Sequence, residues 1–315
     1  MAGLEVKEYP YWNAEQRTLD YEGMLNTMRE APRGSIFILQ AVAHNPTGID
    51  PTREQWQGVA QVMRERNHFP FFDCAYQGIA TGDLDNDAFA VRYFVNEGFE
   101  LFIAQSFSKN FGLYSERAGS LTIVTKKAPI SKEGDAEEAE KTIASKILSQ
   151  IEKLQCAEIL NPPAYGSRVV NTVLNDSALY REWQENLKYM TKRIIETRKA
   201  LFDRFTELGT PGYWGHITTQ VGMYSYTGIT GKIKLFLNRK KMIKQSVAFS
   251  FPSSYWLDDY GPNNNVYYNI AQQAKVLREK YHIYLPDTGR ITIPTISRQN
   301  IDYFAKAMDD VIRNF

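Results

Sequence analysis

The chain has 315 residues, which is long enough for two domains or one large one. Its hydrophobic content of 43%, charged content of 23% and net charge of +1 are typical of a globular protein, and they lack the basic excess of a nucleic-acid-binding protein. Two cysteines and four histidines without ligand spacing argue against a disulfide scaffold and a zinc site, and no apolar run is long enough to span a bilayer.

The first half of the chain alternates short apolar runs with amphipathic stretches. A Thr52-x-x-Gln55 pattern after Pro51 is a capping box, so it predicts a helix start. Strands buried on both faces and separated by helices are typical of an α/β domain with a largely parallel sheet. We expect buried strands at 35–43, 69–73, 99–106 and 119–125, and helices at 54–66 and 86–96.

The second half predicts mainly helices. Residues 131–142 are rich in Glu, Lys and Ala, which favours an exposed helix or loop. A long amphipathic helix over 177–208 would lead into a second domain. That domain would hold strands around 221–226 and 289–293, with helices at 271–281 and 298–313.

Three polar segments follow the first three predicted strands. Ligands of open α/β sheets bind beyond the carboxyl ends of the strands, so these segments predict a ligand site. Singly, each has a plainer interpretation: a turn, a capped carboxylate, a solvated lysine or a weak surface ion pair. Their succession at neighbouring strand ends favours the site. The segments are His44-Asn45-Pro46-Thr47-Gly48, Asp73-Cys74-Ala75-Tyr76-Gln77-Gly78 and Ser106-Phe107-Ser108-Lys109-Asn110-Phe111-Gly112 with Arg117 beyond it.

These segments resemble motifs of the aspartate aminotransferases, which belong to the class I pyridoxal-phosphate-dependent aminotransferases. The matches run in family order over almost the whole chain, and the segment around the lysine is the most specific of them. The further matching motifs are Asn161-Pro162-Pro163, Gly222-Met223-x-Ser225-x-Thr227-Gly228 and Gly289-Arg290-Ile291.

The resemblance implies a role for each matching residue. Lys109 would be the catalytic residue, holding pyridoxal 5'-phosphate as a Schiff base and shuttling the proton, so its pKa must lie below the usual ~10.4 of a free lysine. Asp73 would pair with the ring nitrogen of the cofactor. Tyr76 and Asn45 would donate to its phenolic oxygen, with Asn45 also near the substrate. Ser106 and Arg117 would bind the phosphate of the cofactor, and Arg290 would bind the α-carboxylate of the substrate.

The sequence departs from the family pattern in three places. The chain begins where family members are already well into the large domain, so we expect an N-terminal truncation: a fragment or a misplaced start codon. Residues 231–270 have no family counterpart, and joining Thr230 to 271–273 would recreate a capping box, which suggests a retained intron or a surface insertion. Cys156 stands where the family has an arginine that reaches the neighbouring subunit's site, which puts the preference for dicarboxylates in doubt.

The resemblance implies an α/β protein of pyridoxal-phosphate-dependent transferase fold type I. We expect a large cofactor-binding domain over 1–188 with a mainly parallel sheet, and a smaller α+β domain over 189–315. The expected reaction is ping-pong transamination of L-aspartate and 2-oxoglutarate by a cytoplasmic homodimer without nucleic-acid or membrane partners; a mitochondrial location stays open. The alternatives are a related cofactor enzyme with a changed substrate range, and a catalytically inactive fragment or interaction subunit.

Overall fold

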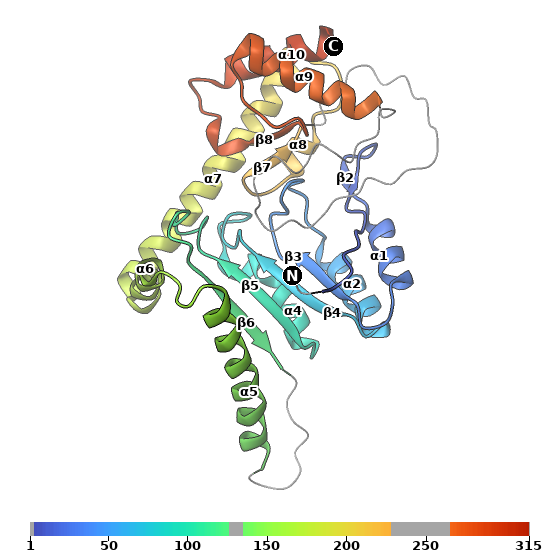
Figure 1. Cartoon of the computed structure of the whole chain (residues 1–315). Coiled ribbons are helices and arrows are strands. Elements are labelled where there is room, and N and C mark those ends of the chain that lie inside the picture. Colours follow the sequence, from blue (N-terminus) through green and yellow to red (C-terminus); the bar gives the residue numbers. More distant parts are fainter. Residues whose placement is uncertain (1–2, 126–134, 228–264, 315) are drawn as a thin grey trace.

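The computed structural model describes residues 3–125, 135–227 and 265–314 (Figure 1). Most of the segment expected as an insertion, 231–264, therefore lies outside the described residues. Residues 265–270 belong to a helix that continues to Tyr281.

A four-stranded sheet occupies the first half of the chain. Its strands are β3 (Ile36–Gln40), β4 (Phe69–Cys74), β5 (Leu101–Ser106) and β6 (Gly119–Val124). They lie side by side in that order, with β3, β4 and β5 parallel and β6 antiparallel to β5. The register pairs Gln40 with Asp73 and Asp73 with Ala104, so the carboxyl ends of the three parallel strands meet at one edge of the sheet.

Helix α2 (Arg53–Glu65) packs against both α1 (Tyr21–Glu30) and α4 (Phe89–Asn96) beside this sheet. The predicted capping box starts α2: the Thr52 hydroxyl accepts from the Gln55 N–H, and the Gln55 side chain accepts from the Thr52 N–H. One buried cluster fills this half, with Met28, Met63, Phe72 and Leu101 essentially inaccessible. A short helix, α3 (Leu84–Asp87), and a two-stranded ribbon of β1 (Trp12–Asn13) and β2 (Thr18–Leu19) complete it.

The second half is built around a long helix, α7 (Ser177–Glu207), which runs from beside the sheet to the C-terminal elements (Figure 1). Asp176 caps it by accepting from the N–H groups of Ala178 and Leu179. Its far end packs in a second buried cluster with α8 (His216–Thr219) and α10 (Ile301–Asn314), and α9 (Asn265–Tyr281) packs on α10. A two-stranded antiparallel sheet of β7 (Tyr224–Tyr226) and β8 (Arg290–Thr292), followed by a 3-10 helix Ile293–Thr295, joins this cluster to the first half.

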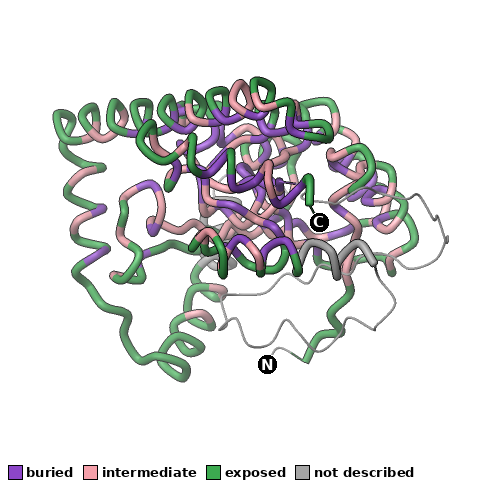
Figure 2. Tube along the Cα trace, turned by 90° about the horizontal axis from the view of Figure 1, so that it is seen from above, coloured by how far each residue is buried: buried purple, intermediate pink, exposed green. Residues whose placement is uncertain are grey.

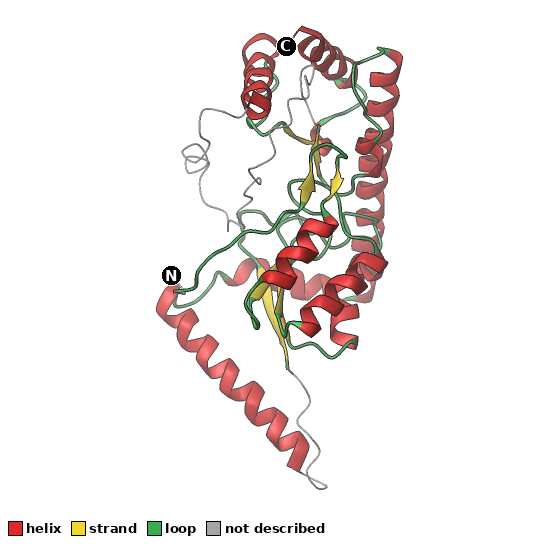
Figure 3. Ribbon diagram, turned by 90° about the vertical axis from the view of Figure 1, so that its right-hand side faces the viewer, coloured by secondary structure: helices red, strands yellow, loops and turns green. Residues whose placement is uncertain are grey.

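Two helices lie between β6 and α7 in the chain order. α6 (Ala164–Asn175) packs on α7, whereas α5 (Asp135–Glu158) projects away from the sheet (Figures 1 and 3). Figure 2 shows the buried residues gathered in the body of the molecule. No helix in the described part of the chain is long and apolar enough to cross a membrane.

Two expectations about elements were wrong. The strand predicted at 119–125 was expected to be buried, but Leu121 of β6 is 49% exposed, because in the described residues β6 pairs on one side only. The single helix predicted at 86–96 is two helices, because Ala88 ends α3 and begins α4.

Candidate active site

The loop that follows β5 carries Lys109 and is fastened at both ends. Ser106 Oγ, at the last residue of β5, accepts from the Ser108 N–H at 3.2 Å. Beyond the lysine, the Asn110 carbonyl accepts from Trp183 Nε1 of α7 at 2.9 Å, and the Asn110 amide donates to the Gln77 carbonyl at 3.2 Å. The loop is therefore held between the end of β4 and the start of α7.

The amine of Lys109 lies in positively charged surroundings. Its Nζ sits 4.4 Å from the centre of the Tyr114 ring. Desolvation first, and then the charges of Arg290 and Arg117, lower the pKa of Lys109 below that of a free lysine. Arg117 is exposed and donates to the Tyr114 carbonyl at 3.1 Å, so the same turn carries the lysine and one of the cations that depress its pKa.

Asp73 lies near the end of β4, the strand that pairs with β5. Partial burial raises the pKa of its carboxyl. No side chain or backbone group in the described part of the chain donates a hydrogen bond to that carboxylate. A half-buried carboxylate without a donor needs a partner to offset its desolvation, so Asp73 is suited to a ligand's N–H group.

Tyr76, Asn45 and Arg290 form a connected network. Asn45 Nδ2 donates to Tyr76 Oη at 3.2 Å, and Arg290 Nη1 donates to Asn45 Oδ1 at 3.0 Å. The Arg290 guanidinium also lies 4.5 Å from the centre of the Tyr224 ring, and the Tyr76 and Tyr224 rings meet edge to face. Burial, and then the neighbouring Tyr224, raise the pKa of Tyr76, so its phenol stays protonated at neutral pH.

The structure thus gathers all seven residues expected from the sequence into one region above the carboxyl edge of the sheet. They are Asn45, Asp73, Tyr76, Ser106, Lys109, Arg117 and Arg290. Their individual roles stay predictions. As a set they offer an amine, two cations, a carboxylate, an amide, a phenol and a hydroxyl, which is a donor set suited to an anionic, carbonyl-bearing ligand.

Two carboxylates that support this region, the part-buried Asp50 and the buried Asp87, were missed at the sequence level. Asp50 accepts from the N–H groups of Ala43 and His44, at 2.6 and 2.8 Å, and so shapes the loop that carries Asn45. Asp87 accepts from the N–H groups of Gly78 and Ala80 and from the Thr81 hydroxyl, which fixes the turn after Tyr76. The sequence signal was weak: each is an aspartate at a helix or turn boundary, where caps are common.

Cys156 lies near the end of α5 and is exposed as a free thiol. The Asn161-Pro162-Pro163 motif follows it and is also exposed. Neither contacts the residues around Lys109 in the described part of this chain.

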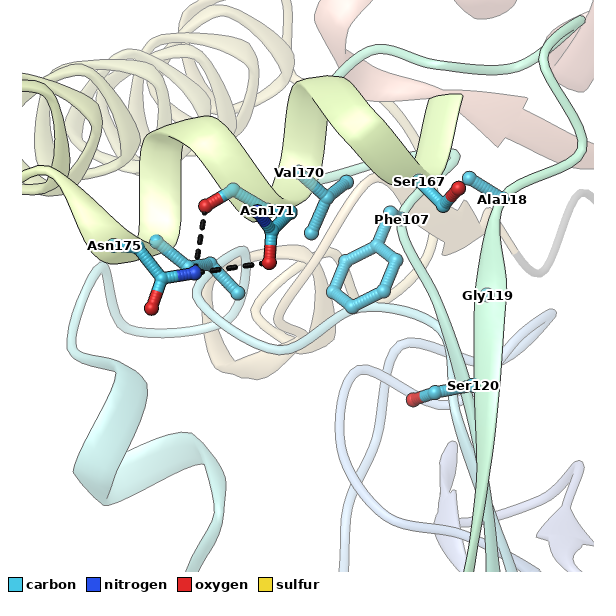
Figure 4. Close-up of a pocket in the computed structure, with 9 residues that line it drawn as sticks. Phe107, Ala118, Gly119, Ser120, Ser167, Val170, Asn171 and Asn175 are labelled. Carbon is cyan, nitrogen blue, oxygen red and sulfur yellow. Dashed lines mark hydrogen bonds between the residues drawn. The ribbon is translucent and has the colours of Figure 1, made fainter. Parts of the chain in front are cut away.

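Among the described residues, two cavities lie away from Lys109. One, of about 270 Å³, lies between β6 and α6, where Phe107 sits beside Val170 and the Asn175 amide donates to Asn171 (Figure 4). The other, of about 260 Å³, lies under β8 and touches Arg290.

A family model described as aminotransferase class I and II matches residues 1–308. The chain belongs to the class I and II aminotransferases. It is 41% identical over 311 residues to the cytoplasmic aspartate aminotransferase of Dictyostelium discoideum and 42% identical over 308 residues to that of Gallus gallus. These matches cover 99% and 98% of this chain but 59% and 62% of the relatives, so the chain spans about three fifths of the length of the curated relatives that it matches.

Solved aminotransferases share the architecture. The cytoplasmic aspartate aminotransferase of Saccharomyces cerevisiae superimposes with a TM-score of 0.81 at 38% identity, covering 98% of this chain and 64% of that one. An aromatic-amino-acid aminotransferase of Burkholderia pseudomallei, described as covalently bound to pyridoxal phosphate, gives 0.79 at 31% identity, covering 99% and 65%. The expected α/β fold of the pyridoxal-phosphate-dependent transferases, with a mostly parallel central sheet, is confirmed.

Proposed function

We propose that the protein is a pyridoxal-phosphate-dependent aminotransferase that converts L-aspartate and 2-oxoglutarate to oxaloacetate and L-glutamate. The observation that carries the proposal is an amine of lowered pKa, Lys109, near two arginines, with the Asp73 carboxyl near the end of the neighbouring strand. The curated relatives of this chain are named aspartate aminotransferases, which supports aspartate as the amino donor.

The donor set fits pyridoxal phosphate. Asp73 has no hydrogen-bond donor within the described residues, and a protonated ring nitrogen would supply one. The Asn45 amide and the Tyr76 phenol, 3.2 Å apart, suit a phenolic oxygen. The Ser106 hydroxyl and the Arg117 guanidinium suit a phosphate. When bound, the cofactor supplies an electron sink for the carbanion formed at the substrate α-carbon.

The chain's own groups would do the rest. Lys109 Nζ, whose pKa is lowered by its surroundings, would hold the cofactor covalently and, once displaced, move the proton at the substrate α-carbon. Arg290, steadied by Asn45 and by the Tyr224 ring, would bind the substrate α-carboxylate. Asp73 would keep a proton on the ring nitrogen through its negative charge.

The proposal includes a homodimer in the cytoplasm. Supporting the dimer are two exposed apolar side chains of α5, Leu148 and Leu154, which are 56% and 64% exposed. The location rests on the cytoplasmic relatives. A second candidate, an aminotransferase of changed substrate range, is favoured by Cys156, because a thiol offers no bidentate cation for a second carboxylate.

The test is covalent loading followed by turnover. The purified chain is incubated with pyridoxal phosphate and reduced with borohydride, and the labelled peptide is identified by mass. We expect the label on Lys109, and we expect Lys109→Ala to lose the label and at least ~10³-fold of the aspartate–2-oxoglutarate rate. Lys188→Ala, which removes an exposed lysine paired with Glu185, is the matched control and should keep both. Labelling spread over surface lysines, with no turnover, would refute the proposal.

A further inference from the structure

A buried arginine on α7, Arg198, makes hydrogen bonds to residues 217–224, the segment that leads from α8 into β7. Arg198 is 2% exposed, and no acidic side chain in the described residues pairs with it. Its guanidinium donates instead to backbone carbonyls. The acceptors are the carbonyl oxygens of Ile217 at 3.2 Å, Val221 at 3.3 Å, Gly222 at 2.9 Å and Tyr224 at 2.6 Å, with the side-chain oxygen of Gln220 at 3.5 Å. One side chain therefore sets the path of residues 217–224.

This segment is pressed against the loop that carries Asn45. The Val221 N–H donates to the Gly48 carbonyl at 2.6 Å. A Cβ on Gly48 would lie 2.7 Å from the Tyr224 carbonyl oxygen, and a Cβ on Gly222 would lie 2.5 Å from the Ala43 side chain. Glycine is required at both positions, because each also has a positive φ. The two backbone segments are therefore in direct contact.

The same segment ends in Tyr224, whose ring supports the Arg290 guanidinium at 4.5 Å. Arg290 in turn donates to Asn45 across the site. The contacts thus connect Arg198 through Tyr224 and Arg290 to Asn45. The loop that carries Asn45 is connected back to Arg198 through Gly48 and Val221.

We propose that Arg198 is a positioning residue, which sets the placement of Arg290 relative to Asn45 by clamping residues 217–224. It acts through the backbone and touches none of the groups expected to contact substrate. The inference deepens the proposed function and rests on it for the kinetic part. Charge alone is insufficient for this role, because five acceptors in different directions need the branched guanidinium, and an ammonium group satisfies fewer of them.

The experiment compares Arg198→Lys and Arg198→Met with Arg204→Lys, a matched control on the same helix. Arg204 pairs with Glu207 and Asp302 at the surface. Hydrogen exchange is followed in 217–224, in 43–48 and in the reference helix 53–65, and KM and kcat for the amino acid are measured on the cofactor-loaded enzyme. For Arg198→Lys we expect exchange to rise about tenfold in the first two segments and not in the third, and KM to rise about tenfold with kcat within about twofold.

Faster exchange in 217–224 alone, or an equal fall in kcat without a change in KM, would overturn the proposal. Arg198→Met tests the same point with the donors removed. If it unfolds, the lysine variant still decides. If the wild-type chain loads no cofactor, the proposed function fails, whereas the exchange measurement still tests the coupling between the two segments.

Discussion

At the scale of single residues, the surroundings of Lys109 matter more than the lysine itself. A lone lysine in a polar turn is ordinarily a solvated charge. Here partial burial and two guanidinium groups lower its pKa, so a larger fraction is neutral at any given pH. The cations act by disfavouring a third positive charge nearby.

This gives a prediction with a definite sign. Arg290→Gln removes a charge that lowers the pKa of Lys109, so that pKa should rise and the neutral fraction at pH 7 should fall. The rate at which pyridoxal phosphate attaches to Lys109, measured against pH, should shift to higher pH. Arg92→Gln, which removes a surface arginine paired with Asp85, should leave the profile in place. A shift to lower pH in Arg290→Gln would contradict the electrostatic explanation.

Cys156 offers a second prediction at this scale. Because it is exposed near the end of a projecting helix, a substitution there should not disturb the core. If each active site of the dimer includes residues from both subunits, the guanidinium of Cys156→Arg should bind the distal carboxylate of aspartate in the neighbouring subunit's site. We expect the ratio of kcat/KM for aspartate to that for alanine to rise by at least ~10-fold. Cys156→Ser is the control, and an unchanged ratio in Cys156→Arg would exclude a role for this position.

The residues that contact the expected ligand could be predicted from the sequence, whereas those that hold them in place could not. Lys109 and Asp73 were identifiable from motifs in a fixed order. Asp50 and Arg198 act on backbone groups that lie close only in the folded chain, and their neighbours in sequence give no sign of it. The pairing of Arg290 with Asn45 spans 245 residues and has no local signature.

At the scale of elements, the predictions succeeded where the local signal was strong. Helix α2 has its capping box and α7 its long amphipathic period, and both were found within one residue of their bounds. The prediction of a buried strand failed at β6, because whether a strand is internal or at an edge depends on which partners lie beside it. Helices α1 and α6 were not anticipated.

Helix α5 carries the prediction for this scale. Its residues Leu148 and Leu154 expose large apolar surfaces on a helix that projects from the body (Figure 3). If these two side chains contact a second copy, Leu148→Lys with Leu154→Lys should convert a dimer to a monomer in sedimentation experiments, with the helix content unchanged by circular dichroism. Lys146→Ala with Lys153→Ala, on the same helix, should stay dimeric. A monomeric wild type would contradict the proposal that α5 contacts a second copy of the chain.

At the scale of the whole molecule, two buried clusters organise the chain. One is formed by residues between Tyr11 and Leu101, and the other combines residues 42–43 and 76–80 with residues 194–312. We propose on this basis the two domains 1–188 and 189–315, with α7 crossing the boundary. The second cluster draws on both, so the domains should unfold together, and a single transition by two spectroscopic probes is expected.

Unfolding should also depend on pH through His44. Burial lowers the pKa of His44 to about 3, well below the ~6.5 of a free histidine. Between these values the unfolded chain binds a proton that the folded chain excludes, so stability is kept above pH 6.5 and falls as the pH drops toward 3. Replacing the ring by a neutral amide in His44→Gln should reduce the slope of unfolding free energy against pH by about 1.4 kcal/mol per unit near pH 5.

Burial raises the pKa of Asp50 to about 6, so the folded chain binds a proton at a higher pH than the unfolded chain does. Asp50 therefore adds stability as the pH falls below 6, opposite to the effect of His44. Denaturant titrations at pH 5 and 7 on both the wild type and His44→Gln separate the two effects. Equal slopes in the two proteins would show that His44 is not neutral in the folded state.

The continuity of α7 has a consequence for how this scaffold can vary. Its 31 residues make a rod about 46 Å long, with Trp183 anchoring the lysine loop near one end and Arg198 fixing the 217–224 segment further along. Adding one residue between these two anchors would rotate one about 100° relative to the other, so that both could not keep their partners. Substitutions on the exposed surface of α7 are therefore compatible with this scaffold, whereas insertions or deletions between Trp183 and Arg198 are not.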